Sequence, residues 1–373
     1  MKLLKFGALT ALAAGALGLT SYTSGCSSKE TPDSGTTNMV GIVPPPKPEA
    51  GPPPTMDEQT FALNTLLLGD SVRGQTTTST TAWKDYGFNI DGKISDAKST
   101  DVCTRASGAP SSVQTDGNRG IDNSFGANIL PIVQSAGSIP NPSQTITDTI
   151  TKGNFTIQFK IKGLSGAKQT NTGLSAQLFA SGVFDEDGGA KPTFTMADDW
   201  PVRPELLNDG KTVASGSKVT FPDSYITGGT FVTPTGTITL SLVFQGVALD
   251  IDIVKAVVVM DINGDNGDNG TIAGVIPTEK LITGLQSVAG RISKSLCGSA
   301  FDGIAQQIRQ TSDILSDGTN SAGKACDAIS IGIGFTSKRI KNPTKVAGLG
   351  TPSDDPCKAP ADSGVPTDSG AGG

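Results

Sequence analysis

Strict alternation of apolar and polar residues in three separate segments is the feature that most limits how this chain can fold. In residues 154–163, two Phe and two Ile alternate with Thr, Gln and two Lys. Residues 237–244 and 329–335 repeat the pattern with other residue types. Because successive side chains of a β-strand point to opposite faces, each segment is predicted to be a strand with one face in a core.

The longest apolar stretch, residues 237–276, is predicted to contain two or three long strands separated by turns. Gly (47) and Pro (23) are frequent and charged residues make up only 17% of the chain, as in exported β-proteins with many turns. The predicted fold class is therefore mostly β, an antiparallel sandwich-like arrangement of two packed sheets in residues 59–350. That length allows one large domain or two closely packed ones.

One region has helical periodicity instead. Apolar residues recur every three or four positions in residues 278–296 and again in residues 299–316. Thr278 is suited to cap the first segment. Two amphipathic helices are predicted here, forming a hairpin that packs on the sheet. Gly332 and Gly334 in the last strand indicate a close approach, which we expect to come from this helical hairpin.

The N-terminal residues have the three parts of an export signal. Lys2 and Lys5 precede an apolar stretch, residues 6–19, that is too short to span a bilayer as a helix, since a span takes about 20 apolar residues. Small and polar residues follow and end at Cys26.

With Gly25 before Cys26, and with Thr23 where an aliphatic residue is usual, this segment resembles the lipobox of bacterial lipoproteins. The resemblance implies a signal peptide in residues 1–25, cleavage by signal peptidase II and lipidation of Cys26. It also implies the outer membrane, because Ser27 replaces the Asp that retains such proteins at the inner membrane. Either leaflet, periplasmic or surface-facing, remains open, and an ordinary secretory signal is the alternative.

Two low-complexity segments flank the predicted domain. Residues 26–58 contain Pro-Pro-Pro twice and little apolar periodicity, so they are expected to remain disordered and to act as an extended tether. Residues 351–373 are rich in Pro, Ser, Gly and Asp and are expected to form a low-complexity tail.

Histidine is absent from the whole sequence, which excludes Ser-His-Asp and Cys-His catalysis and His-ligated zinc or haem. The formal net charge of −6 argues against nucleic acid as a partner.

Four cysteines remain besides Cys26, and an even number in an exported chain predicts two disulfides. Three pairings are possible. We expect Cys297–Cys326, which would close the helical excursion, and Cys103–Cys357, which would join the tail to the N-terminal part.

An acidic loop, residues 261–270, has oxygen-bearing side chains at alternate positions, as short loops that wrap Ca²⁺ do. The same residues also suit a polar hairpin tip, since Asn-Gly is a preferred turn. Residues 116–123 form another acidic loop of this kind and are expected to be a solvated turn. The hypothesis of a calcium site names Asp261, Asn263, Asp265 and Asp268.

Three aromatic residues are candidates for stacking on sugar rings, with burial in the core as the alternative: Trp83, Tyr86 and Trp200. Asp250 and Asp252 alternate with apolar residues, which places both carboxylates on one strand face about 6.7 Å apart, near the spacing that inverting glycosidases use. A solvated strand face is the expected explanation of the pair, because nothing else in the sequence marks a catalytic cleft.

The expected function is a non-catalytic lipoprotein of the cell envelope, held at the membrane by its N-terminal lipid. Its expected partner is a glycan or another envelope component such as a protein, and Ca²⁺ is the one cofactor considered. The alternative is a carboxylate-dependent carbohydrate-active enzyme of the glycosidase type, which would use Asp250 and Asp252.

Overall fold

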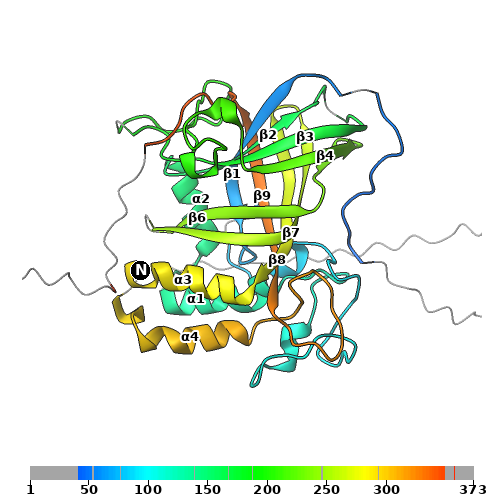
Figure 1. Ribbon diagram of the computed structural model, residues 1–373, viewed down its shortest axis with the longest axis vertical. Helices are drawn as coiled ribbons and strands as arrows, with labels where there is room; N and C mark the ends of the chain where they lie inside the picture. The colour runs from blue at the N-terminus through cyan, green and yellow to red at the C-terminus, as the bar shows by residue number, and fades with distance from the viewer. Residues whose placement is uncertain are drawn as a thin grey trace, which may run out of the picture. The chain divides into compact units, whose positions relative to one another are not determined.

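The alternating segments become strands of one antiparallel sheet (Figure 1). The computed structural model describes residues 41–52, 54–75, 77–137, 139–166, 168–186, 188–244, 247–292, 294–348 and 357. The strands in these residues are β1 (Glu58–Leu67), β2 (Ile157–Lys162), β3 (Asn171–Ala180), β4 (Val219–Thr227), β5 (Thr230–Val232), β6 (Gly236–Phe244), β7 (Val247–Asn263), β8 (Asn266–Pro277) and β9 (Ala328–Ile340).

The sheet closes on itself. Its order is β5-β4-β3-β2-β1-β9-β8-β7-β6, and β5 also pairs with β7, where Phe231 lies opposite Met260. Eight strands therefore form a closed barrel and β6 is an extra strand on the first half of β7. The mostly β, antiparallel class is confirmed. The strands form one closed sheet instead of the two packed sheets of a sandwich, because the β5–β7 pairing joins the two ends.

The inward faces of the alternating segments fill the barrel. Phe159 on β2 and Phe335 on β9 are fully buried, and their rings stack with centroids 5.9 Å apart. Phe61 of β1 is the register partner of Phe159 and is equally buried. Each such side chain contributes about 2–3 kcal/mol by leaving water.

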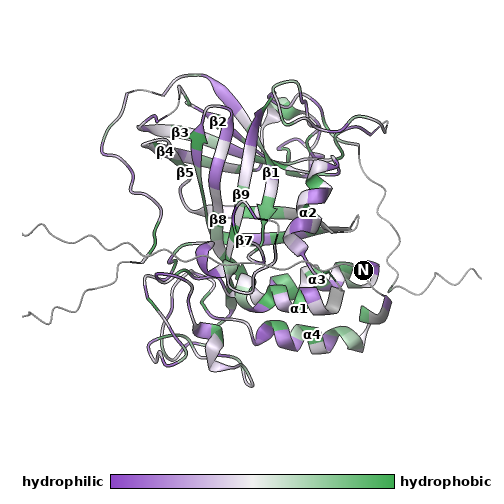
Figure 2. Ribbon diagram, turned by 180° about the vertical axis from the view of Figure 1, so that it is seen from behind, coloured by the Kyte–Doolittle hydropathy of each residue, from purple (hydrophilic) through white to green (hydrophobic). Residues whose placement is uncertain are grey.

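Helices form a layer beside the barrel (Figures 1 and 2). They are α1 (Leu130–Gly137), α2 (Pro142–Thr151), α3 (Thr278–Ile292) and α4 (Ser299–Arg309). In both views α1, α3 and α4 lie together at one end of the molecule, and α3 packs against β7. The predicted helical pair near the C-terminus is confirmed.

The second helix of that pair is shorter than predicted. It ends at Arg309, and the backbone N–H of Asp313 then donates to the carbonyl of Ala328 at 3.1 Å, next to the start of β9. The first helix ends at Ile292 and is followed by a short 3₁₀ turn, Lys294–Leu296. The sequence did not predict α1 or α2. Asn141 caps α2 by accepting from the N–H of Gln144.

The close approach at β9 is confirmed, but its source differs from the expectation. An added Cβ on Gly332 would lie 2.1 Å from the carbonyl oxygen of Tyr86, and one on Gly334 would lie 2.3 Å from the ring of Tyr86. The loop that carries Tyr86, and not the helical hairpin, packs on this face.

Two disulfides form, as predicted, but with exchanged partners: Cys103–Cys326 and Cys297–Cys357. The reason is local backbone pairing. Thr104 exchanges hydrogen bonds with residues 324–326, which lie beside it, so Cys103 meets Cys326 at a Cα separation of 5.2 Å. Both bonds indicate a domain that folds in an oxidising, extracytoplasmic compartment.

The predicted signal peptide, Cys26 and most of the predicted tail lie outside the described residues. Hydrogen bonds hold the described part of the predicted tether against two loops and β4. The backbone N–H of Ile42 donates to the carbonyl of Arg119 at 3.1 Å, and the carbonyl of Ile42 accepts from the backbone N–H of Asn89 at 2.7 Å. The carbonyl of Pro45 accepts from the hydroxyl of Tyr225.

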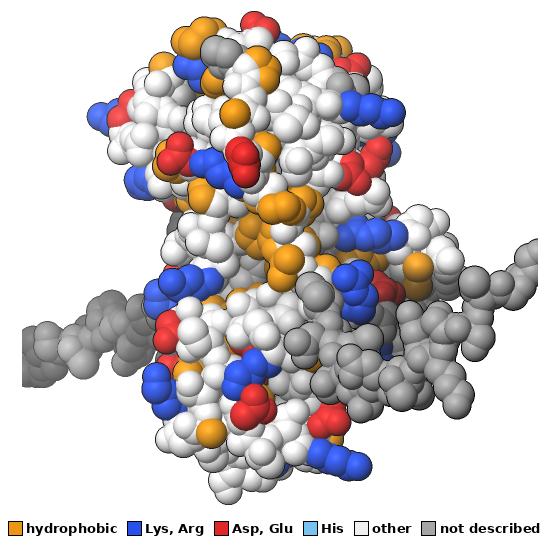
Figure 3. Space-filling model, turned by 90° about the vertical axis from the view of Figure 1, so that its right-hand side faces the viewer, with side chains coloured by type: hydrophobic (Ala, Val, Ile, Leu, Met, Phe, Trp, Pro, Cys, Tyr) orange, Lys and Arg blue, Asp and Glu red, His pale blue; other side chains and the backbone are white. Residues whose placement is uncertain are grey.

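Figure 3 shows the side along which this segment runs in Figure 1. Hydrophobic side chains gather midway along it, and charges of both signs are scattered above and below. None of the helices in the described part of the chain combines the length and the hydropathy needed to cross a bilayer.

Candidate functional site

The proposed calcium ligands lie on a regular hairpin. Asp261 on β7 is the register partner of Asp268 on β8, and Asn263 pairs with Asn266 across a turn in which Gly264 has a φ of 60°. The carboxylate of Asp261 accepts from Thr230 at 2.7 Å and from Asn269 at 2.9 Å, and that of Asp265 faces Arg339 at 3.4 Å. Among the described residues, no group of three or more Asp, Glu, Cys or His side chains is placed to hold a metal ion. The three carboxylates of the proposed set are therefore not gathered at one point.

Asp250 and Asp252 share the outer face of β7, as the alternation predicts, while Leu249 and Ile251, which alternate with them, are buried. Arg203 lies 3.8 Å from the Asp250 carboxylate. Lys280 lies 3.7 Å from the Asp252 carboxylate, which also accepts from Thr239 at 2.8 Å. These are surface ion pairs, and neither carboxylate lines the pockets described below.

The three candidate aromatic residues separate into two kinds. Trp200 and Tyr86 are 0% and 1% exposed, so neither has a face available to a sugar ring. Trp83 is half-buried and lines a surface pocket. The structure therefore leaves Trp83 as the one member of the set that can meet a ligand.

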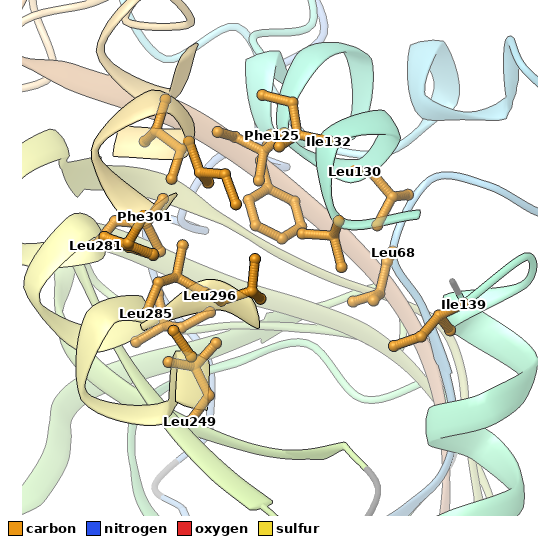
Figure 4. A pocket seen from close by; sticks show the side chains of 16 residues that line it. Leu68, Phe125, Leu130, Ile132, Ile139, Leu249, Leu281, Leu285, Leu296 and Phe301 are labelled. Carbon is orange, nitrogen blue, oxygen red and sulfur yellow. The ribbon is translucent and has the colours of Figure 1, made fainter. Parts of the chain in front are cut away.

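A pocket with an apolar lining lies between the helix layer and β7 (Figure 4). We call it the apolar cleft. Its volume is about 90 Å³. All sixteen lining residues are aliphatic or Phe: Leu68, Phe125, Ile129, Leu130, Ile132, Val133, Ile139, Leu249, Ile251, Leu281, Leu285, Ala289, Leu296, Phe301, Ile304 and Ile308.

The helix sequences explain how the apolar cleft arises. Leu281, Leu285 and Ala289 recur at intervals of four on α3, so they share one face. Phe301, Ile304 and Ile308, at intervals of three and four, share one face of α4. A third wall comes from α1 and from the π-helical turn before it, Phe125–Ile129.

The apolar cleft is open on one side. Most of its lining residues are buried, but five at its rim are only half-buried: Ile132, Val133, Leu285, Leu296 and Ile304. A hydrophobic group could therefore enter past these side chains without displacing the core beneath them.

A second pocket, of about 530 Å³, lies on the other side of α1, and we call it the Trp83 pocket. Its lining is mixed. Trp83 and Leu130 are apolar, whereas Thr80, Gln134 and Ser135 supply hydroxyl and amide groups. Asp70 also lines it, and its carboxylate accepts from the hydroxyl and the backbone N–H of Ser143 near the start of α2. This contact fixes the pocket wall, since a carboxylate stabilises a helix N-terminus.

Only the tip of the polar loop at 116–123, Asn118 and Arg119, is an exposed turn, whereas Asp116 is half-buried and Asp122 is buried, so the expectation of a solvated turn holds for the tip alone. Asp122 is 3% exposed, and its carboxylate accepts from the N–H of Ile90 at 2.6 Å. Asp313, on the chain after α4, is also buried and accepts from the N–H of Ser330 at 2.8 Å. These carboxylates hold loops together in the protein interior.

Burial raises the pKa of the Asp313 carboxyl to about 7, and the neighbouring charge of Asp91 adds to the effect. Burial also raises the pKa of Asp116 to about 7, with further contributions from Asp91 and Asp313. The pKa of Asp122 is raised well above its usual range for the same reasons, burial first.

These pKa values predict that stability falls as pH rises from 5 to 8. A carboxyl with a raised folded-state pKa keeps a proton that the unfolded chain releases near pH 4, so its contribution is complete below pH 4 and is lost as pH rises through about 7. Each such group changes the free energy of unfolding by about 1.4 kcal/mol per pH unit between its two pKa values.

Urea unfolding at pH 5 and pH 8 measures this difference. Asp313→Asn, which keeps an acceptor for Ser330 and cannot ionise, is expected to reduce the loss between the two pH values. Asp302→Asn, at an exposed position of α4, serves as the control and should leave it unchanged. An equal loss in the Asp313→Asn protein would show that Asp313 does not titrate in this window.

The sequence patterns predict part of the lining of the apolar cleft. The α3 and α4 residues were predicted as the inner faces of two helices. Those before and within α1 were missed, although Phe125, Ile129 and Ile132 recur at intervals of four and three. The Gly and Pro residues around them conceal that helical signal.

Comparison with protein-family models, with curated proteins and with solved structures finds no match. The geometry of the two pockets is therefore the basis for a functional assignment.

Proposed function

We propose that this protein is a non-catalytic, outer-membrane lipoprotein of the cell envelope that binds the alkyl chain of an envelope amphiphile in its apolar cleft. The observation that carries the proposal is the lining of the cleft, in which every residue is aliphatic or Phe. The predicted lipid on Cys26 supports it, because a tethered domain would stay close to molecules that carry alkyl chains.

An alkyl chain suits this cleft better than a peptide does. A peptide segment brings backbone N–H and C=O groups, which lose free energy on burial unless they are hydrogen-bonded. The side chains that line the cleft offer no hydrogen-bond donor or acceptor. A volume of about 90 Å³ is smaller than the engineered cavity of about 150 Å³ that binds benzene, so the cleft takes the end of a chain and not its whole length.

A displacement titration tests the proposal. The chain from residue 26, with Cys26→Ser to remove the predicted lipid, is loaded with the fluorescent fatty acid cis-parinarate. Unbranched alkanoates of increasing length then compete below their micelle concentrations. Each buried methylene contributes about 0.8 kcal/mol, so affinity should rise about fourfold per carbon and then level off once the cleft is full.

Leu285→Trp, at the rim of the cleft, should weaken binding at least tenfold by filling the entrance. Gln307→Trp places the same ring on the exposed face of α4 and is the matched control, with binding unchanged. No binding by the unsubstituted protein, or equal binding by all three proteins, would rule out the cleft as an alkyl-chain site.

A further inference from the structure

We infer that the Trp83 pocket holds the head of the same amphiphile, and that this head is an uncharged sugar ring. The inference rests on the proposed function, because it assigns a head-group site to a ligand whose chain lies in the apolar cleft.

The two pockets adjoin. Leu130 of α1 lines both of them. At three places, one residue lines the apolar cleft and the next residue in the sequence lines the Trp83 pocket: Leu68 and Gly69, Phe125 and Gly126, Ile139 and Pro140. In Figure 4, Leu68, Leu130 and Ile139 lie at the same end of the apolar cleft. The half-buried rim residues Ile132 and Val133 of the cleft are followed directly by Gln134 and Ser135 of the Trp83 pocket. A ligand whose chain end enters at this rim would cross α1 here, with its apolar part on one side of the helix and its polar part on the other.

The chemistry of the Trp83 pocket fits a sugar. A pyranose ring has an apolar C–H face, which packs on an aromatic ring, and a rim of hydroxyl groups, which need donors and acceptors. Trp83 is half-buried and supplies the ring. Ser79, Thr80 and Gln134 supply groups that both donate and accept.

The charge in the pocket argues against an anionic head such as a phosphate or a carboxylate. Asp70 lines the pocket and no Lys or Arg is among its lining residues in the described chain. Lys84 lies with its ammonium 5.7 Å from the centroid of the Trp83 ring but is not part of the lining. An anion would therefore face a carboxylate without a lining cation, and like charges side by side disfavour binding.

Three amphiphiles with the same eight-carbon chain test the inference below their micelle concentrations: octyl glucoside, the uncharged tetraethylene glycol octyl ether, and octanoate. The chain from residue 26 with Cys26→Ser is titrated with each of them. We expect octyl glucoside to bind at least tenfold more tightly than the other two.

Trp83→Ala should bring the glucoside to within about twofold of the ether and leave the ether itself unchanged, whereas Trp83→Phe should keep most of the preference. Tryptophan fluorescence gives an independent readout, because the sequence has only two Trp and Trp200 is fully buried. The glucoside should change the emission of the protein, and Trp83→Phe should abolish that change.

The outcomes separate this inference from the proposed function. Equal affinities for the three amphiphiles, or equal weakening of all three by Trp83→Ala, would overturn the sugar-head assignment while chain binding stands. If none of the three binds, and cis-parinarate does not bind either, the proposed function itself fails. Leu285→Trp should weaken the binding of all three ligands at least tenfold, since it acts on the chain that they share.

Discussion

Replacing Gly332 by Ala is expected to lower the free energy of unfolding by about 3 kcal/mol. The new Cβ would lie 2.1 Å from the carbonyl oxygen of Tyr86 and 2.7 Å from the Cα of Gly87. Both are backbone atoms, so neither can turn aside as a flexible side chain would. Relief requires the loop and β9 to move apart.

That separation would also break a buried hydrogen-bond network. The amide of Asn123 donates to the carbonyls of Trp83, Tyr86 and Gly332 at 3.1 Å, and its oxygen accepts from the N–H of Gly332 at 3.0 Å. Buried polar groups that lose their partners cost about 1–3 kcal/mol each.

Gly303→Ala is the matched control for Gly332→Ala. It lies within α4, where an added Cβ meets nothing within 4 Å, so Ala should raise stability by about 0.5–1 kcal/mol. Guanidinium unfolding of both variants measures the contrast. A Gly332→Ala protein as stable as its parent would mean that the contact between β9 and the Tyr86 loop is loose.

Loss of the Cys103–Cys326 disulfide in Cys103→Ser/Cys326→Ser is expected to cost about 4–5 kcal/mol. The bond links residues 223 positions apart, and a longer loop loses more entropy when it is closed in the unfolded chain. Cys103 is also 1% exposed, so the replacement leaves a hydroxyl in a buried position.

Cys297→Ser/Cys357→Ser is the comparison. That bond spans only 60 positions and Cys357 is exposed, so its removal should cost less than that of Cys103–Cys326. Chemical unfolding in the absence of reductant measures both variants. A larger loss for Cys297–Cys357 would show that closure of the C-terminal segment matters more for stability than the link between the two loops.

The sequence predicted strands where alternation was long and uninterrupted. It could not predict how the sheet closes, because β5 has only three residues, Thr230–Val232, and so short a strand carries only a weak alternation that does not identify its partner. The closed barrel depends on that short strand pairing with β7. The cysteine pairing failed for a related reason: it is decided by which loops lie side by side, and Thr104 beside Ala325 is a tertiary contact without a local pattern.

Only part of the lining of the candidate site could be predicted from the sequence. Helical spacing identified the faces of α3 and α4 that line the apolar cleft, but the wall from α1 comes from a distant part of the chain. Nothing in the neighbouring residues distinguishes Trp83, which lines a pocket, from Trp200, which the rings of Phe184 and Phe194 contact in the interior. Asp122 lies in a loop that was expected to be a solvated turn and is buried, and nothing in the sequence indicated that Asp313 would be buried as well.

The length of β7 has a mechanical consequence. Its first half presents Leu249 and Ile251 to the apolar cleft, and its second half forms the short seam with β5 that completes the barrel. The end of a bound alkyl chain would contact the first half of β7, and the second half of the same strand forms the pairing with β5. Ligand binding would then change the rate at which the β5–β7 pairing opens. Hydrogen exchange of the β5 backbone amides, compared with and without ligand, would show that change.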